Sequence, residues 1–235
     1  MSIKSFFKSH GKQISISASI NSNIRKLAKL GKLNANQVID NRINQADKYS
    51  FAIKDLLLNI GLKRKNLTIE GFDISHHGGQ DAVASAVRFS SHGPEKKDYR
   101  LFNIPKEFSG NDIASMRHVL ERRINKKNIN PLPDIILIDG GKLQLEVALS
   151  AFSVLAKKSP MILSIVKGSK RVRSTETILS KGGIIEMPKD SPGFLLLQQI
   201  RDESHRFAIT SNRKKKNKSI KKSCLLYTSP SPRDS

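Results

Sequence analysis

The 235-residue chain is long enough for one domain of ordinary size with flanking segments, and its hydrophobic content of 37% supports a core. Its formal net charge of +22 favours a polyanionic partner, above all nucleic acid; a compositional bias toward lysine is the alternative source of part of this charge. No apolar run approaches the roughly 20 residues that cross a bilayer, so no membrane partner is expected. Residues 1–13 lack the pattern of a secretory signal. The single cysteine, Cys224, excludes a disulfide framework and a cysteine-based zinc site within the chain.

The first 62 residues predict a helical lead-in. Apolar residues recur at helical spacing from Ile20 to Phe51, and the spacing continues through residues 52–62, with Gly61 as a natural stop. This segment lacks the dense apolar pattern of a core and is typical of the remnant of a larger upstream region.

Residues 63–212 predict an α/β domain. Three β-prone runs form an antiparallel meander, and helices then alternate with two more strands and a hairpin. The expected strands are 68–75, 82–89, 99–104, 135–139 and 161–166, the hairpin is 176–179 with 183–187, and the expected helices are 111–126, 142–155 and 191–210. This order predicts a mixed five-stranded sheet flanked by helices, as in ribonuclease H-like domains.

The last part of the chain, residues 213–235, changes character. Residues 213–222 include seven lysines and arginines, which predict a basic disordered tail. The following residues, SCLLYTSPSPRDS, have no relation to what precedes them and resemble a translated sequencing adapter. A natural Ser/Pro tail is the alternative, and neither carries chemistry.

Two predicted strands carry a carboxylate among apolar neighbours. Asp73 lies inside the first strand, and Asp139 ends the fourth, directly before Gly140 and Gly141. Burial of a charge costs several kcal/mol unless the charge is paired or bound to a cation. If these strands are neighbours, the carboxylates meet, and Mg²⁺ or Mn²⁺ relieves their repulsion. A simple turn residue is the alternative for Asp139, whereas Asp73 has no such local explanation.

His205 completes the candidate set of metal ligands and catalytic residues. An imidazole can bind a second ion or transfer protons at neutral pH, and an exposed helical histidine is the alternative. Such a set, with a divalent ion, is suited to hydrolysis of a phosphodiester. Asp112 is a fourth candidate, although a favourable position at a helix N-terminus explains it equally well. His76 and His77 point to opposite faces of a strand, so at most one lines the site.

Four basic residues are candidate DNA contacts. Lys142 follows two glycines at a helix N-terminus, a place that suits a phosphate. The Gly-Gly-Lys sequence is too short for a Walker loop, and Leu143 replaces its hydroxyl residue. Arg201, Arg206 and Arg213 form a basic stripe that suits the DNA backbone rather than its bases. A solvated charged face is the alternative.

A series of longer motifs gives a more specific signal than these single residues do. The chain contains, in order, IEGFDISHHGG, VASAV, KKDYRLFNI, NDIASMRHVLERR, LPDIILIDGGKLQL and LLLQQIRDESHRFAI. From about Leu67 to Arg213 this series resembles the C-terminal half of the UvrC family, the excinuclease subunit of bacterial nucleotide excision repair. The upstream LAKLGKLNAN, residues 27–36, resembles the segment that precedes it in that family.

The resemblance implies a ribonuclease H-like, metal-dependent endonuclease that cuts damaged double-stranded DNA 5′ to a lesion. It implies UvrB as partner, with UvrA acting earlier in the pathway, and a bacterial cytoplasmic location at the nucleoid during repair. Carried over residue by residue, the family's catalytic aspartates fall on Asp73 and Asp139, its histidine on His205, and a further aspartate of this incision on Asp112.

The chain also departs from the family pattern. The N-terminal GIY-YIG nuclease domain and a helix–hairpin–helix pair at the C-terminus are missing, and Asn212 stands where a histidine usually precedes the arginine matched by Arg213. We therefore expect a piece of a longer protein, truncated at both ends. The alternatives are a basic scaffold that binds DNA and UvrB without cutting, and an RNA-cleaving or junction-resolving relative with the same fold.

Overall fold

The computed structural model describes residues 22–64, 67–75, 83–108, 110–125, 131–166 and 176–226, with the backbone alone beyond residue 211. Contacts divide the chain into two units, 1–44 and 45–235. The described part of the first unit is helical and exposes Leu27, Leu30 and Leu33. The second unit contains the sheet, its covering helices and the candidate site.

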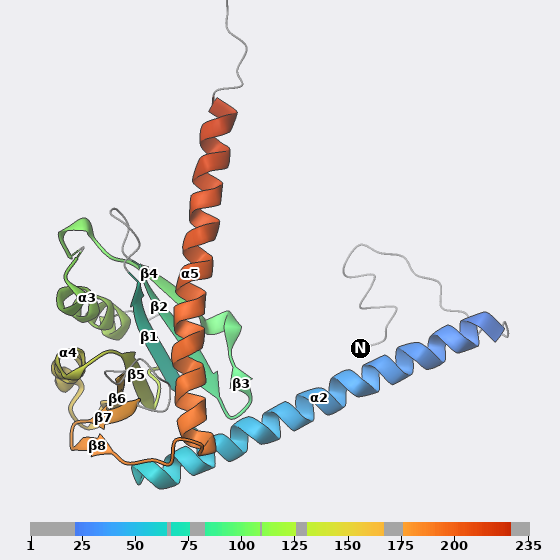
Figure 1. Ribbon diagram of the computed structural model, residues 1–235, viewed down its shortest axis with the longest axis horizontal. Helices are drawn as coiled ribbons and strands as arrows, with labels where there is room; N and C mark the ends of the chain where they lie inside the picture. Colours follow the sequence, from blue (N-terminus) through green and yellow to red (C-terminus); the bar gives the residue numbers. More distant parts are fainter. Residues whose placement is uncertain are drawn as a thin grey trace, which may run out of the picture. The chain divides into compact units, whose positions relative to one another are not determined.

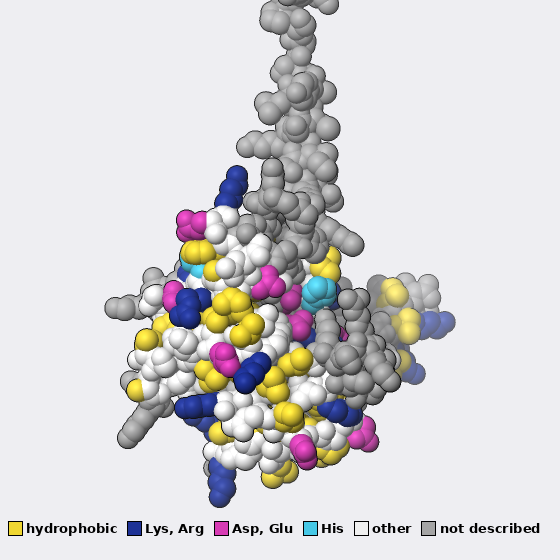
Figure 2. Space-filling view, turned by 60° about the vertical axis from the view of Figure 1, so that its left-hand side comes forward, with side chains coloured by type: hydrophobic (Ala, Val, Ile, Leu, Met, Phe, Trp, Pro, Cys, Tyr) yellow, Lys and Arg dark blue, Asp and Glu magenta, His cyan; other side chains and the backbone are white. Residues whose placement is uncertain are grey.

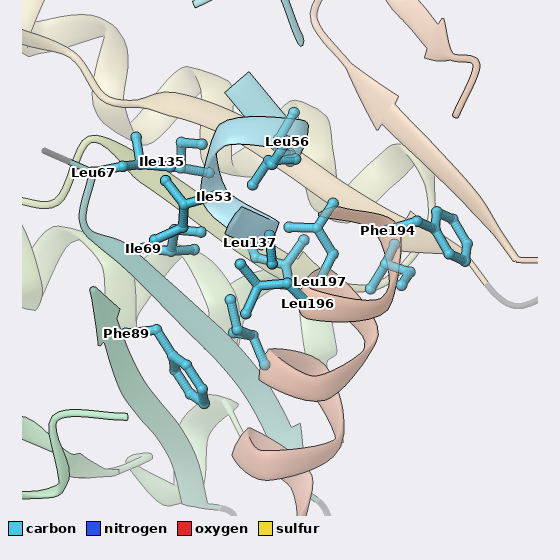
Figure 3. Close-up of a cluster of buried hydrophobic side chains, with 14 of the residues drawn as sticks. Ile53, Leu56, Leu67, Ile69, Phe89, Ile135, Leu137, Phe194, Leu196 and Leu197 are labelled. Carbon is cyan, nitrogen blue, oxygen red and sulfur yellow. The ribbon is translucent and has the colours of Figure 1, made fainter. Parts of the chain in front are cut away.

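Helix α2, Ser22–Ile60, ends where the sequence predicts a stop. Gly61 adopts a φ of +71°, and the Leu62 amide donates to the Leu57 carbonyl at 3.0 Å. The part of α2 that belongs to the second unit buries Ile53 and Leu56 against the sheet (Figure 3). The predicted domain boundary at residue 62 therefore differs from the division after Asn44, because the last turns of this helix are part of the core.

The sheet is mixed and has eight strands rather than the five that the sequence predicts. Their order is β3-β2-β1-β5-β6-β7-β8, with β4 paired to β2. The strands are β1 (Ile69–Ser75), β2 (Val83–Ser90), β3 (Gly93–Pro94), β4 (Arg100–Asn103), β5 (Ile135–Asp139), β6 (Met161–Val166), β7 (Thr177–Ser180) and β8 (Gly183–Ile185). The antiparallel meander of β1, β2 and β4 is confirmed, and β1, β5 and β6 are parallel. The predicted hairpin adds β7 and β8 to the edge at β6, and the two-residue β3 is the eighth strand.

Helices cover both faces of the sheet (Figure 1). On one face lie α3 (Asp112–Asn125) and α4 (Lys142–Phe152), whose Met116 and Ala148 join Phe72 and Ile138 of the sheet in one hydrophobic cluster. On the other face, α5 (Pro192–Leu226) and the end of α2 join Ile69 and Leu137 in a second cluster. Three short 3₁₀ helices, η1 (Lys96–Asp98), η2 (Lys106–Phe108) and η3 (Ser153–Lys158), complete the fold. The sheet thus lies between two apolar layers.

Helix α5 is longer than the sequence predicts. The expected end lies near Thr210, with a disordered tail from residue 213, but α5 continues to Leu226. The chain has no glycine or proline between Gly193 and Pro230, so no residue with a strong preference against helix interrupts it.

Candidate active site

Asp73 is buried on the face of the sheet that α5 covers. It is 6% exposed and alternates along β1 with Phe72, which belongs to the opposite cluster. Gly71, on the same face, brings α5 close: a Cβ atom at this position would lie 2.5 Å from the Cγ2 atom of Ile200. The backbone of α5 therefore lies directly over the strand that carries Asp73.

Asp139 lies beside Asp73 on the neighbouring parallel strand. The last register pair of β1 and β5 is Phe72↔Ile138, so the two aspartates are the next residue on each strand. Asp139 follows the same alternation as Leu137, which belongs to the cluster under α5. Because adjacent strands lie about 5 Å apart, the two aspartates occupy neighbouring backbone positions at the ends of these strands. The predicted pairing of these strands is confirmed.

His205 comes to this edge from α5. Its Nδ1 atom lies 3.2 Å from Oδ2 of Asp73, although 132 positions separate the two residues in the chain. The imidazole is 55% exposed, whereas the Asp73 side chain is 8% exposed. A buried carboxylate therefore contacts a ring that is open to solvent.

Charged neighbours surround His205 on α5. Arg206 donates from Nε and Nη2 to the two oxygens of Glu203, both at 2.7 Å. These hydrogen bonds lower the pKa of Glu203 and raise the pKa of Arg206. Burial and the nearby Glu203 carboxylate raise the pKa of Tyr99 above its usual range. Figure 2 shows a face on which acidic side chains gather beside a histidine, with lysines and arginines scattered singly over the rest of it.

Asp112 is the first residue of α3 and is exposed. Asn111 caps this helix through Oδ1, which accepts the Ala114 amide at 3.0 Å. Strands β1 and β4 both pair antiparallel with β2, so β4 leaves the sheet at the edge where β1 ends. Strand β4 therefore ends at the same end of the sheet as the strand of Asp73, and α3 begins nine residues later. Helix α3 covers the face of the sheet opposite α5.

The described residues contain no group of three or more His, Cys, Asp and Glu side chains placed to hold a metal ion. The predicted ligand set of Asp73, Asp139 and His205 is not such a group in this structure. Its donors are nevertheless of the right chemical kind, because paired carboxylate oxygens suit a hard divalent cation whose other positions are filled by phosphate or water. His76 and His77 lie outside the described residues.

The candidate DNA contacts have different environments. Lys142 begins α4 directly after the glycines and is 82% exposed. Arg206 is exposed but held by Glu203, and the side chain of Arg213 lies outside the described set. Arg201 is buried, bonded to Glu176 and Asp202, so it is not presented to a DNA backbone. These bonds outweigh the effect of burial and raise its pKa further.

Sequence reasoning missed two buried carboxylates, Glu70 and Glu176. Glu70 is 5% exposed and is enclosed by Arg88 and Arg123, and Glu176 is 3% exposed and bonds Arg201. The signal for Glu70 was the same as that for Asp73, a carboxylate in a β-prone apolar run, and Arg88 in the paired strand was its complement.

The mixed sheet with helices on both faces is of the ribonuclease H-like type. A protein-family model described as the UvrC RNAse H endonuclease domain matches residues 36–209. The chain therefore belongs to the family of UvrC ribonuclease H endonuclease domains.

Curated relatives are named UvrABC system protein C. The protein of Colwellia psychrerythraea is 40% identical over 228 residues, which cover 90% of this chain and 35% of that protein. The protein of Idiomarina loihiensis is 38% identical over 218 residues, 91% of this chain and 35% of the relative. The chain thus spans 35% of the length of either relative. Among solved structures, human ENDOV has a TM-score of 0.32 and 14% identity over 43% of this chain and 46% of that one, a likeness too weak to support an inference.

Across the helices that the structure describes, none combines the length and the apolar character needed to cross a bilayer.

Proposed function

We propose that this domain hydrolyses a phosphodiester of damaged double-stranded DNA on the 5′ side of a lesion, in nucleotide excision repair. The contact between His205 and Asp73, on a strand beside that of Asp139, carries the proposal. The proposal brings the carboxylates of Asp73 and Asp139 and the imidazole of His205, from three separate elements, to one end of the sheet. Such a set is costly in a core and useful for a reaction that moves a proton and develops negative charge.

The buried Asp73 and the half-exposed His205 have different roles in this proposal. In the tautomer protonated at Nδ1, His205 donates a hydrogen bond to the buried Asp73, which sets the ring orientation. Nε2 is then the ring nitrogen that takes or gives a proton at the DNA. For Asp112 we propose a supporting role, in which the carboxylate at the start of α3 orients an incoming group or a second ion in the complex with DNA.

Asp73 and Asp139 would hold a divalent cation, Mg²⁺ or Mn²⁺, and would leave the ring of His205 to the proton transfer. Such an ion, when bound, supplies Lewis-acid activation of the scissile phosphate and of water. The two carboxylates bring the negative charge that attracts it, and their position at a strand end leaves its outer side to the phosphate oxygens.

The exposed basic side chains would hold the DNA backbone. Lys142 is the foremost of these, because it lies three residues after Asp139 and at a helix N-terminus that favours a phosphate. Arg206 and Arg213 extend the contact along α5. Arg201 is omitted because its guanidinium is buried and paired with Glu176.

The relatives' name suggests the assembly in which the domain works. UvrABC system protein C names a component of a multi-protein system, and we propose UvrB on DNA as the direct partner, with UvrA acting before it. The domain organisation that we propose is residues 63–212 as the nuclease domain, with the end of α2 packed onto it.

The test is incision of a duplex with one lesion, loaded with UvrA and UvrB, by the 235-residue chain in Mg²⁺ or Mn²⁺. We expect a cut 5′ to the lesion that Asp139→Asn abolishes. Asp190→Asn is the matched control, because Asp190 is an exposed aspartate between β8 and α5. Equal cutting by Asp139→Asn would contradict the proposal. DNA binding that is steeply salt-dependent and never leads to a cut would support the basic scaffold instead.

A further inference from the structure

Ser85 is a hydroxyl residue at the centre of β2, in a run whose other members are mostly apolar. It is 0% exposed, and it is the register partner of Asp73 in the antiparallel pair of β1 and β2. Directly opposed residues of a sheet point to the same face, so Ser85 lies under α5 together with Asp73.

The Ser85 hydroxyl donates to the backbone of α5. Its Oγ atom lies 2.8 Å from the carbonyl oxygen of Ser204, the residue before His205. A helix carbonyl already accepts the amide four residues further on, so α5 does not need this bond to satisfy its own backbone. The bond instead links the strand beside Asp73 to the helix turn that carries His205.

The hydrogen bond from Ser85 lies where α5 packs tightly on the sheet. Ser204 is 1% exposed and its own hydroxyl donates to the Arg201 carbonyl at 2.7 Å. At Gly71, two residues before Asp73, α5 and β1 are already in close contact. A small rotation or slide of α5 about that contact moves the half-exposed His205 ring relative to Asp73.

We propose that Ser85 is a positioning residue: its hydrogen bond to the Ser204 carbonyl fixes the turn of α5 that sets Nδ1 of His205 against Asp73. Ser85 touches neither substrate nor reacting atoms. The inference rests on the proposed function only for its effect on incision, since the placement of the imidazole is a property of the folded chain.

Ser115 provides a matched control. It is also 0% exposed, and its Oγ atom donates to the Phe108 carbonyl at 3.0 Å. It lies on α3, which covers the opposite face of the sheet. Ser85→Ala and Ser115→Ala therefore remove the same group from the same kind of bond, and they differ in whether that bond leads to His205.

The first measurement is the Nδ1 resonance of His205 in the ¹⁵N-histidine-labelled 235-residue chain at one fixed pH, assigned by its loss in His205→Ala. We expect Ser85→Ala to move this resonance toward that of free imidazole, Ser115→Ala to leave it in place, and Ser85→Thr, which keeps the hydroxyl, to restore it. An unmoved resonance in Ser85→Ala would overturn the proposal. If Ser85→Ala does not fold, Ser85→Cys, which keeps a side chain of similar size with a weaker donor, takes its place.

The second measurement is incision of lesion DNA loaded with UvrB. Ser85→Ala is expected to lower kcat about tenfold, as loss of a residue that orients a metal or catalytic side chain does, with KM for the loaded DNA unchanged. A displaced resonance with unchanged kcat would overturn the role in the reaction. Absence of incision by the unmodified chain would instead contradict the proposed function, and the resonance of His205 would still decide the placement.

Discussion

Strand β1 carries two buried carboxylates of opposite kinds. Glu70 and Asp73 are three residues apart, on opposite faces of the sheet, and are 5% and 6% exposed. Glu70, toward α3, accepts hydrogen bonds from Arg88 at 2.8 Å and from Nε and Nη2 of Arg123 at 2.9 and 2.8 Å. Asp73, toward α5, meets a half-exposed imidazole at the edge of the sheet, beside the strand of Asp139.

The two carboxylates are buried to nearly the same extent, and what differs is the groups that they contact. Two guanidinium groups neutralise the charge of Glu70 within the core. The carbonyl of Pro131 accepts from both arginines as well, which ties β1, β2, α3 and the approach to β5 together. Asp73 lies at the end of β1, where it contacts the half-exposed ring of His205 and where the neighbouring strand carries Asp139.

The largest effect on stability is expected from Glu70→Gln. This change removes the buried carboxylate that Arg88 and Arg123 share, which costs about 3–5 kcal/mol of the free energy of unfolding. Urea denaturation measures the loss. Glu95→Ala is the control, because Glu95 contacts Arg88 at 3.3 Å but its side chain is 28% exposed, so about 1 kcal/mol or less is expected. A loss below 1 kcal/mol in Glu70→Gln would remove the distinction between the two carboxylates.

Asp73→Asn also replaces a buried carboxylate by an amide, on the other face of the sheet. It should lower incision strongly and change the free energy of unfolding little. We expect incision to fall by about 100-fold or more, because this residue orients His205 and brings charge for a divalent ion. The free energy of unfolding should change by no more than about 1 kcal/mol, since removal of the charge also removes its desolvation cost. Incision and urea denaturation are measured on the same preparation. A variant that unfolds as easily as Glu70→Gln would place Asp73 among the structural carboxylates.

Mn²⁺ alone, without DNA, should bind the folded chain through Asp73 and Asp139. At ten times its Kd, an ion that binds only the folded chain stabilises it by about 1.4 kcal/mol. We expect this gain in thermal or urea denaturation of the unmodified chain and not in Asp73→Asn or Asp139→Asn. The Glu95→Ala variant should retain the gain in full. An equal gain in all four proteins would show that Mn²⁺ binds elsewhere.

The sequence predicts correctly that the strands of Asp73 and Asp139 are neighbours, because the local pattern of each strand and the order of the elements indicate it. A carboxylate in an apolar strand signals a need for a partner, and β5 repeats the signal at Asp139. The alternation of strands and helices then makes β1 and β5 neighbours. The position of Asp112 at the start of α3 follows from the capping pattern at Asn111.

Other features depend on partners that no local pattern identifies. Arg201 has the sequence environment of an exposed basic residue, and only its contact with Glu176, 25 residues away, makes it part of the interior. The last turns of α2 likewise have ordinary helical spacing, and the sheet beneath them converts Ile53 and Leu56 into core residues. The hairpin of β7 and β8 is visible in the sequence, but its pairing with β6 is not.

The smallest expected effect is a pH dependence that involves neither buried carboxylate. Glu203, next to Ser204 and His205, has a pKa below its ordinary value of 4.5 because Arg206 donates two hydrogen bonds to it. Its contribution to stability is therefore present in full above pH 4.5 and is lost as the pH falls through the lower pKa of the folded chain. Urea denaturation at pH 6.0, 4.5 and about 3.5 should show the difference in free energy of unfolding between the unmodified chain and Glu203→Gln shrinking as the pH falls. Since the arginine is largely exposed, this difference is about 1 kcal/mol or less even at pH 6. A difference that stays constant or grows toward low pH would mean that Arg206 does not stabilise the ionised form of Glu203.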